Sequence, residues 1–313
     1  MPHTNKSCYE RTRLYFLTYL CDHHCSLIYG RPPMTREWQS LKDPRAFLQS
    51  PHAKCTDICL ISQVEFWSIS RRVFEHFGAD VESSLASQRS ADVEHLSHAY
   101  DKWRQDWLGV LTIQAQKSGF APYLFDFYFN SAKLHLYSHV FRGASQAQTD
   151  IRRSDDTDLL GRQAFESALS VVRCAVEGNE ACCWLRYMPS YFGTMIAFAS
   201  ICLVKFSAQE QSLTDAKRKE SLQGLRLLSS ALQTITTEGS ITHPLVSLAK
   251  GLDTAINSGP QNISTNPDST TDAVTNDSTL DFDQFGSDFI NWNFPGFDDY
   301  WTMCPDDASS PTF

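Results

Sequence analysis

The sequence predicts an all-α body followed by a disordered acidic tail, and three observations lead to this fold class. Apolar residues recur at three- and four-residue steps through residues 11–257, which is the spacing of a helix face. Strand signals are scarce, because no long alternating run lies between Asn-Gly or Asp-Gly turns. At Gly259 the composition changes to Ser, Thr, Asn, Asp and Pro, with little to bury.

We therefore expect three parts. A multi-helix domain occupies residues 1–258, and the composition of residues 259–277 is that of a disordered linker. Residues 278–313 form a separate segment in which aspartates and aromatic residues alternate.

The first expected helix begins near residue 11 and ends at Gly30. Proline lacks a backbone donor and clashes with the preceding helical turn, so Pro32 and Pro33 stop the helix. One face collects apolar residues at helical spacing: Leu14, Leu17, Cys21, Cys25 and Ile28. We expect this face to lie in the core, with the two cysteines acting as small hydrophobic residues.

Three further helices follow before residue 143. The second spans about 56–77 and ends at Gly78, the third spans about 91–116, and the fourth spans about 122–141. The second helix has a predicted core side formed by Ile58, Ile61, Glu65, Ile69, Val73 and Phe77. The third has one formed by Leu96, Tyr100, Trp103, Trp107, Val110 and Leu111.

The second half of the body continues this pattern. Residues 150–157 are polar and predict a loop that supplies the N-cap of a helix over 158–177. Residues 183–206 predict the most buried helix, which kinks or restarts at Pro189. Its most apolar window, residues 191–206, is sixteen residues long and falls short of the roughly 20 needed to span a bilayer. An amphipathic helix over 214–237 and a short helix over 245–256 complete the domain.

The charge is distributed unevenly along the chain. The net charge is −9, yet residues 260–313 contain ten Asp and no Glu, Lys or Arg, so the tail carries −10 and the body about +1. A neutral body without a large basic stripe, joined to an acidic tail, repels phosphate. We do not expect this chain to bind DNA directly, and no membrane segment is expected.

The ten cysteines are sparse and irregularly spaced, which predicts free thiols in a reducing compartment. Cys21 and Cys25, with Cys55 and Cys59, form two pairs at i, i+4, and histidines 23 and 24 lie beside the first pair. Such donors keep a zinc site open as an alternative. Core packing is the interpretation that we favour, because buried free cysteine behaves as a hydrophobe.

Motifs of known enzyme classes are missing. The chain has no Gly-x-Ser-x-Gly, His-Glu-x-x-His, Gly-x-Gly-x-x-Gly or Walker sequence. His135 and His139 have a spacing that suits a metal, but no third ligand lies near them in the sequence. We expect no catalytic residue, no metal and no cofactor, and therefore no enzyme.

The acidic-aromatic segment is the strongest functional signal in the chemistry of the chain. Its aromatic residues follow three- and four-residue steps among aspartates: Phe282, Phe285, Phe289, Trp292, Phe294, Phe297 and Trp301. Like charges keep such a segment expanded and its rings available to a partner's groove. Acidic-hydrophobic alternation is typical of activation domains, so we expect transcriptional coactivators as partners.

A family resemblance supports this interpretation. Residues 13–34, RLYFLTYLCDHHCSLIYGRPPM, resemble a motif in the central regulatory domain of fungal zinc-cluster transcription factors. The matching positions are Arg13, Tyr15, Phe16, Leu17, Tyr19, Asp22, Gly30, Arg31 and Pro32. The resemblance implies a nuclear regulator, an activator, of a fungal pathway such as a secondary-metabolite gene cluster or nutrient and protease genes.

One feature of that family is missing. Its members begin with six cysteines that bind two zinc ions, and no cysteine here has the C-x2-C-x6-C spacing. The resemblance then implies either a truncated chain or a regulator that works through a DNA-binding partner or a homo- or hetero-oligomer. The alternative function is an α-helical ligand-binding protein or enzyme whose pocket no sequence motif reveals.

Overall fold

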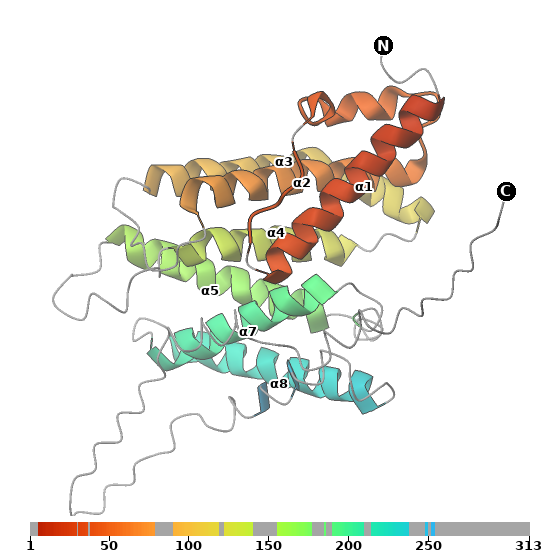
Figure 1. The fold of residues 1–313 in the computed structure, drawn as a ribbon. Helices are drawn as coiled ribbons and strands as arrows, with labels where there is room; N and C mark the ends of the chain where they lie inside the picture. Colours follow the sequence, from red (N-terminus) through yellow and green to blue (C-terminus); the bar gives the residue numbers. More distant parts are fainter. Residues whose placement is uncertain are drawn as a thin grey trace, which may run out of the picture.

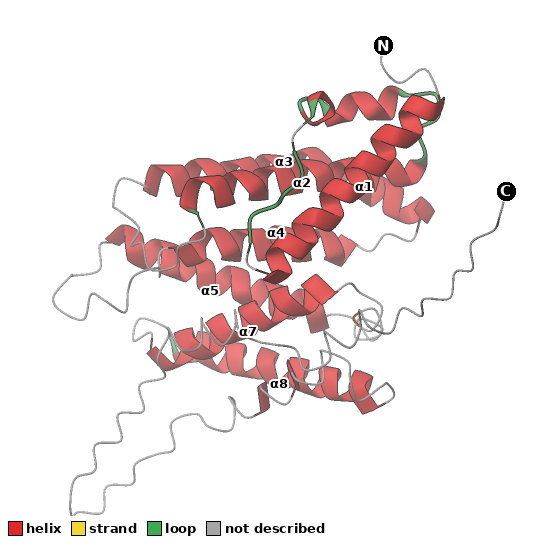
Figure 2. Cartoon of the chain, in the orientation of Figure 1, coloured by secondary structure: helices red, strands yellow, loops and turns green. Residues whose placement is uncertain are grey.

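The computed structural model describes residues 6–29, 31–36, 38–78, 90–118, 122–139, 155–176, 185, 190–209, 214–237, 248–249 and 252–253. Within these ranges the regular secondary structure is helical and no strand occurs, which confirms the all-α prediction (Figure 2). The predicted linker and the acidic-aromatic segment lie outside the described residues.

Seven α-helices and two short 3₁₀ helices make up the described part of the chain. They are α1 (Lys6–Tyr29), η1 (Gln39–Leu41), η2 (Pro44–Gln49), α2 (Cys55–Phe77), α3 (Ser90–Ser118), α4 (Pro122–Ser138), α5 (Asp155–Val176), α7 (Ser190–Gln209) and α8 (Asp215–Thr237). None of the described helices is both long and apolar enough to cross a membrane.

The helices stack largely in chain order. α2 packs on α3, α3 on α4, and α4 on α5, while α5 contacts both α7 and α8. Figure 1 shows α1 crossing this stack obliquely, from α2 toward α7. Because α1 touches both α2 and α7, it connects the first and the later helices of the domain.

Aromatic rings fill the interior between α2, α3 and α4. Phe66 of α2 is fully buried, and the centroids of the Tyr100, Trp103 and Tyr128 rings lie within 5.7 Å of its own. The indole N–H of Trp103 donates to the carbonyl of Ser62 at 2.8 Å. Since each such ring buries on the order of 200 Å², these contacts set how α3 lies on α2.

The predicted core side of α1 is largely wrong, although Ile28 near its end packs against the core. Leu14 and Leu17 are 64% and 37% exposed, and Cys21 is exposed as well. The buried side holds Tyr9, Phe16, Tyr19, Leu20 and His23. These residues also follow helical spacing, and aromatic rings bury more apolar area than leucine or cysteine. α1 also begins at Lys6, earlier than the expected residue 11.

The predicted faces of α2 and α3 are largely confirmed. On α2, Ile61, Val73 and Phe77 are buried, whereas Glu65 is only half-buried and pairs with Arg45. On α3, the predicted core residues are buried except Val110, which is 43% exposed. The core side predicted for α3 therefore included one residue, Val110, that faces outward.

The helix boundaries differ from the predictions by a few residues. α4 ends at Ser138 and not near 141, and α5 begins at Asp155 inside the predicted loop. Acidic side chains favour a first helical turn, where they meet the positive end of the helix dipole. α7 begins at Ser190, one residue after Pro189, and α8 matches its prediction within one residue.

Candidate functional site

The joint between α1 and α2 is built on one buried carboxylate. Asp57, at the third position of α2, is fully buried. Its oxygens accept hydrogen bonds from the Tyr9 hydroxyl at 2.6 Å, the Arg13 Nε at 2.9 Å and the Lys54 backbone N–H at 2.7 Å. Arg13, the first residue of the family motif, therefore serves as the charge partner that allows this carboxylate to be buried.

A second carboxylate ties the chain that follows α1 back onto that helix. Asp22 Oδ2 accepts from both the backbone N–H and the hydroxyl of Thr35, each at 2.6 Å. Partial burial alone would raise the pKa of Asp22, but the Thr35 donors outweigh it and lower that pKa. The Thr35 carbonyl accepts in turn from Arg71 Nη1 of α2 at 3.0 Å. Thr35 thus bridges α1 and α2.

Tyr15 holds the same returning segment further along. Its hydroxyl donates to the Arg36 carbonyl at 2.8 Å and accepts from the Trp38 backbone N–H at 3.2 Å. The Tyr15 and Trp38 rings stack with centroids 5.2 Å apart. The chain after the proline pair is consequently fixed along the side of α1.

The motif residues that the structure describes therefore have structural contacts. Phe16 and Tyr19 are fully buried in the core. Arg31 and Pro32 are exposed, with the Arg31 guanidinium 5.2 Å from the centroid of the Tyr29 ring. Gly30 lies outside the described residues. The spacing of the motif is explained by the return of the chain onto α1 and α2.

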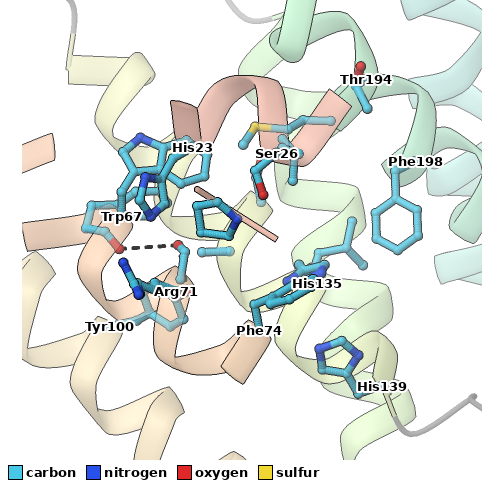
Figure 3. A pocket seen from close by; sticks show the side chains of 18 of the residues that line it. His23, Ser26, Trp67, Arg71, Phe74, Tyr100, His135, His139, Thr194 and Phe198 are labelled. Atoms are coloured by element: carbon cyan, nitrogen blue, oxygen red, sulfur yellow. Dashed lines mark hydrogen bonds between the residues drawn. The ribbon is translucent and has the colours of Figure 1, made fainter. Parts of the chain in front are cut away.

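A pocket lies beside this joint, enclosed by α1, α2, α3, α4 and α7. It holds about 240 Å³. Figure 3 shows side chains from these helices converging on it. Its described lining residues are His23, Ser26, Leu27, Arg31, Pro33, Phe66, Trp67, Ser70, Arg71, Phe74, Gly78, Tyr100, Ser131, Ala132, Leu134, His135, His139, Thr194, Met195 and Phe198. Most of this surface is apolar and much of it is aromatic.

Buried polar atoms on pocket-lining residues of α1, α2 and α4 have no hydrogen-bond partner in the described structure. They are His23 Nε2, Trp67 Nε1 and Ser131 Oγ. The three residues are 3%, 4% and 6% exposed. Buried polar groups are nearly always paired with protein, water or ligand, so these atoms make the pocket a candidate site for a polar group.

Two adjacent histidines on α1 are held neutral by their surroundings. Burial lowers the pKa of His23, whose Nδ1 lies 2.8 Å from the Tyr19 carbonyl. Because a carbonyl only accepts, Nδ1 carries the proton and Nε2 is an acceptor in the neutral ring. Burial, followed by the neighbouring His23, lowers the pKa of His24 to about 4. The His24 ring stacks on Tyr191 of α7 with centroids 3.9 Å apart.

The charges around the pocket are sparse. Among its described lining residues there is no Asp or Glu, and the two arginines are Arg31 and Arg71. Arg71 is already engaged, because its Nε donates to Glu75 at 2.7 Å. The described lining of the pocket is therefore apolar with a few hydrogen-bonding atoms.

The predictions for cysteine are partly wrong. Cys21 and Cys55 are exposed, Cys25 and Cys59 are half-buried, and only Cys174 and Cys202 of the described cysteines are buried. Nowhere in the described ranges do three His, Cys, Asp or Glu side chains gather as metal ligands would. His135 and His139 contact each other, with ring centroids 4.9 Å apart.

Sequence reasoning missed the pocket and the buried Asp57. A weak signal existed for Asp57, because an acidic residue in a first helical turn often serves as a cap. No comparable signal existed for the pocket. The predicted activation-segment residues, Phe282, Phe285, Phe289, Trp292, Phe294, Phe297 and Trp301, lie outside the described residues.

Comparison with curated proteins finds a fungal relative. The chain is 30% identical over 214 residues to the transcriptional activator of proteases prtT of Emericella nidulans. The match covers 65% of this chain and 32% of that protein, so the chain spans about a third of the relative's length. No protein-family profile and no solved structure matches the chain.

Proposed function

We propose that this chain is the regulatory part of a fungal transcription factor of the zinc-cluster type, and that it activates transcription in the nucleus. The observation that carries the proposal is the 30% identity over 214 residues to a transcriptional activator. The resemblance of residues 13–34 to a motif in the regulatory domain of that family also supports the proposal.

The genes under control are proposed from the same relative. Its name describes an activator of proteases, so genes for proteases or nutrient use are the first candidates for this chain. A secondary-metabolite gene cluster is the other candidate that the family resemblance implies.

In this proposal the body and the tail have separate tasks. The motif residues of the helical body are engaged in internal contacts. We therefore assign the regulatory contacts with other proteins to the outer surfaces of this body. The acidic-aromatic segment recruits coactivators by docking its rings in their apolar grooves. In this proposal DNA contacts come from a zinc cluster outside this sequence, from a DNA-binding partner or from an oligomer.

The activation step can be tested with a reporter. Residues 260–313, fused to a heterologous DNA-binding domain, should activate transcription of a gene that carries its binding site. Replacing Phe285, Phe289 and Trp292 together by alanine should reduce activation at least about tenfold, since aromatic anchors carry most of the energy of such docking.

A matched control keeps the charge and the length. Replacing Asn262, Ser264 and Thr271 by alanine changes three linker residues and should leave activation unchanged. If both triple variants activate equally, docking by the aromatic residues is wrong. If the unaltered fusion does not activate at all, the tail is not an activation segment.

The pocket favours a second candidate function, the binding of a small molecule. An aromatic-lined cavity of about 240 Å³ with unpaired polar atoms is a common form of ligand site. Ligand binding is compatible with transcriptional regulation. Ligand binding would equally suit an α-helical binding protein that has no role in transcription.

A further inference from the structure

We propose that the pocket between α1, α2, α3, α4 and α7 binds a small uncharged molecule that combines an apolar, ring-sized body with a hydroxyl group, as phenols do. The proposal goes beyond the transcriptional role and does not depend on it, because it rests only on the described residues of the pocket.

The unpaired atoms of the pocket provide the first step. His23, Trp67 and Ser131 come from α1, α2 and α4, and all three residues are more than nine-tenths buried. Leaving a buried donor or acceptor unpaired is unfavourable, because the group loses its hydrogen bonds to water and gains none in return. Three such atoms around one cavity are therefore best explained by a partner that occupies it.

The chemistry of these atoms selects the polar group of the ligand. His23 Nε2 is an acceptor, because Nδ1 donates to the Tyr19 carbonyl. The indole N–H of Trp67 is a donor, and a serine hydroxyl can do both. The His23 and Trp67 rings lie close together, with centroids 5.9 Å apart. A hydroxyl both donates and accepts, so it matches this pair, whereas a carboxylate can only accept.

The size and lining of the pocket select the body of the ligand. The volume of about 240 Å³ exceeds the ~150 Å³ of an engineered apolar cavity that takes up benzene. It falls below the ~300 Å³ at which sites for drug-sized ligands begin. Phe74, Met195 and Phe198 contribute apolar walls. One ring with a short substituent is the size that fits.

The charges argue for a neutral ligand. An amine would need an acidic partner, and no Asp or Glu is among the described lining residues. An anion would need a cation, and Arg71 is committed to Glu75 at 2.7 Å and to the Thr35 carbonyl at 3.0 Å. Arg31 is exposed. Figure 3 shows Arg71 on the α2 side, with Phe198 and His139 on the other side of the pocket.

The direct test compares p-cresol with toluene on the full chain. The two molecules share a ring and a methyl group, and only p-cresol has a hydroxyl. Titration calorimetry or ligand-observed NMR should give p-cresol at least a tenfold lower Kd, because toluene displaces water and leaves the polar atoms unpaired. Equal affinity for p-cresol and toluene, or binding of neither probe, would overturn the proposal. The unpaired polar atoms would then be hydrogen-bonded to water.

The His23→Phe variant tests the polar contact itself. It keeps an aromatic ring and removes Nε2, so the preference for p-cresol over toluene should disappear. His24→Phe is the matched control, because His24 is adjacent and also carries an unpaired Nε2 but does not line the pocket. That variant should keep the full preference. Loss of preference in both variants, or in neither, would contradict the assignment.

A second pair of variants, at two serines, keeps the proposal testable if the histidine variants misfold. Ser131→Ala removes the hydroxyl at the pocket and should weaken p-cresol binding several-fold while leaving toluene unchanged. Ser200→Ala removes a buried hydroxyl of α7 that donates to the Ile196 carbonyl and does not line the pocket. It should bind both probes like the unaltered chain. If Ser131→Ala also binds both probes like the unaltered chain, Ser131 does not contact the ligand and the proposed site is wrong.

Discussion

Arg13 and Asp57 lie 44 positions apart in the chain and meet at 2.9 Å between Arg13 Nε and Asp57 Oδ1. Asp57 is fully buried and Arg13 is about a third exposed. The ion pair therefore sits at the edge of the core, with the carboxylate inside and the guanidinium partly in water. α1 is docked on α2 through this contact and through the Tyr9 hydroxyl bound to the same carboxylate.

The first prediction concerns this joint. Asp57→Ala should lower the free energy of unfolding by about 3 kcal/mol, because it removes three hydrogen bonds and leaves Arg13 and Tyr9 without their acceptor. Urea unfolding followed by far-UV circular dichroism measures the change.

The control for Asp57 is Asp106→Ala. Asp106 is 30% exposed and pairs with Arg45 and Lys102 at the surface. Ion pairs of this kind contribute about 0–1 kcal/mol, so the control should change stability little. If both variants lost the same free energy of unfolding, the buried Asp57 would contribute no more to stability than the surface residue Asp106.

The second prediction concerns the orientation of α1 and its thiols. Cys21 is exposed, whereas Cys202 of α7 is buried and its pKa is raised by burial to about 12. The thiolate is the reactive form, so iodoacetamide should label Cys21 in the native protein more than ~100-fold faster than Cys202. Peptide mass spectrometry gives both rates in one sample.

Cys55 and Cys174 serve as the internal controls for this labelling. Cys55 is exposed and should react like Cys21, and Cys174 is buried and should be protected. All four should react alike after unfolding. A protected Cys21 would mean that α1 turns its Leu14 side to the core, as the sequence pattern alone predicts.

The contrast between α1 and α8 shows how far the sequence predicts this fold. α8 has one apolar stripe, and its other sides are polar apart from the exposed Leu227, so its face and its bounds were both predictable: Leu225, Leu228 and Leu232 are buried. α1 is apolar on two sides, and periodicity cannot choose between them. The choice depends on which side meets α2 and α7, and that is a property of the whole fold.

The pocket could not be predicted for a similar reason. Its lining comes from five helices, and only three of its residues, His23, Ser26 and Leu27, belong to α1. In the sequence His23 is one of two adjacent histidines, and no motif distinguishes it from His24. That its Nε2 is buried and unpaired follows from packing against Trp67, which no local pattern encodes. The contact between Asp22 and the chain that returns after α1 was easier to predict, because the motif includes both Asp22 and the turn at Gly30, Arg31 and Pro32.

The last prediction concerns the pH dependence of stability. Burial lowers the pKa of His24 from an ordinary 6.5 to about 4 in the folded protein. Below pH 6.5 the unfolded chain therefore takes up a proton at His24 that the folded protein refuses until about pH 4. The contribution of His24 is fully present above pH 6.5 and is lost as the pH falls through this window.

His24→Phe should flatten this dependence. The phenyl ring can keep the stack on Tyr191, and it cannot be protonated. Between pH 7.5 and pH 4.5 the unaltered protein should lose on the order of 2–3 kcal/mol more stability than the variant, since one pKa unit corresponds to about 1.4 kcal/mol. Urea unfolding at both pH values measures the difference. The variant keeps every carboxylate of the unaltered protein, and His98→Phe, at an exposed site on α3, should keep the steeper loss of the unaltered protein. Equal slopes for unaltered protein and His24→Phe would show that the folded protein admits the proton at His24, and the ring would then not be enclosed between α1 and α7.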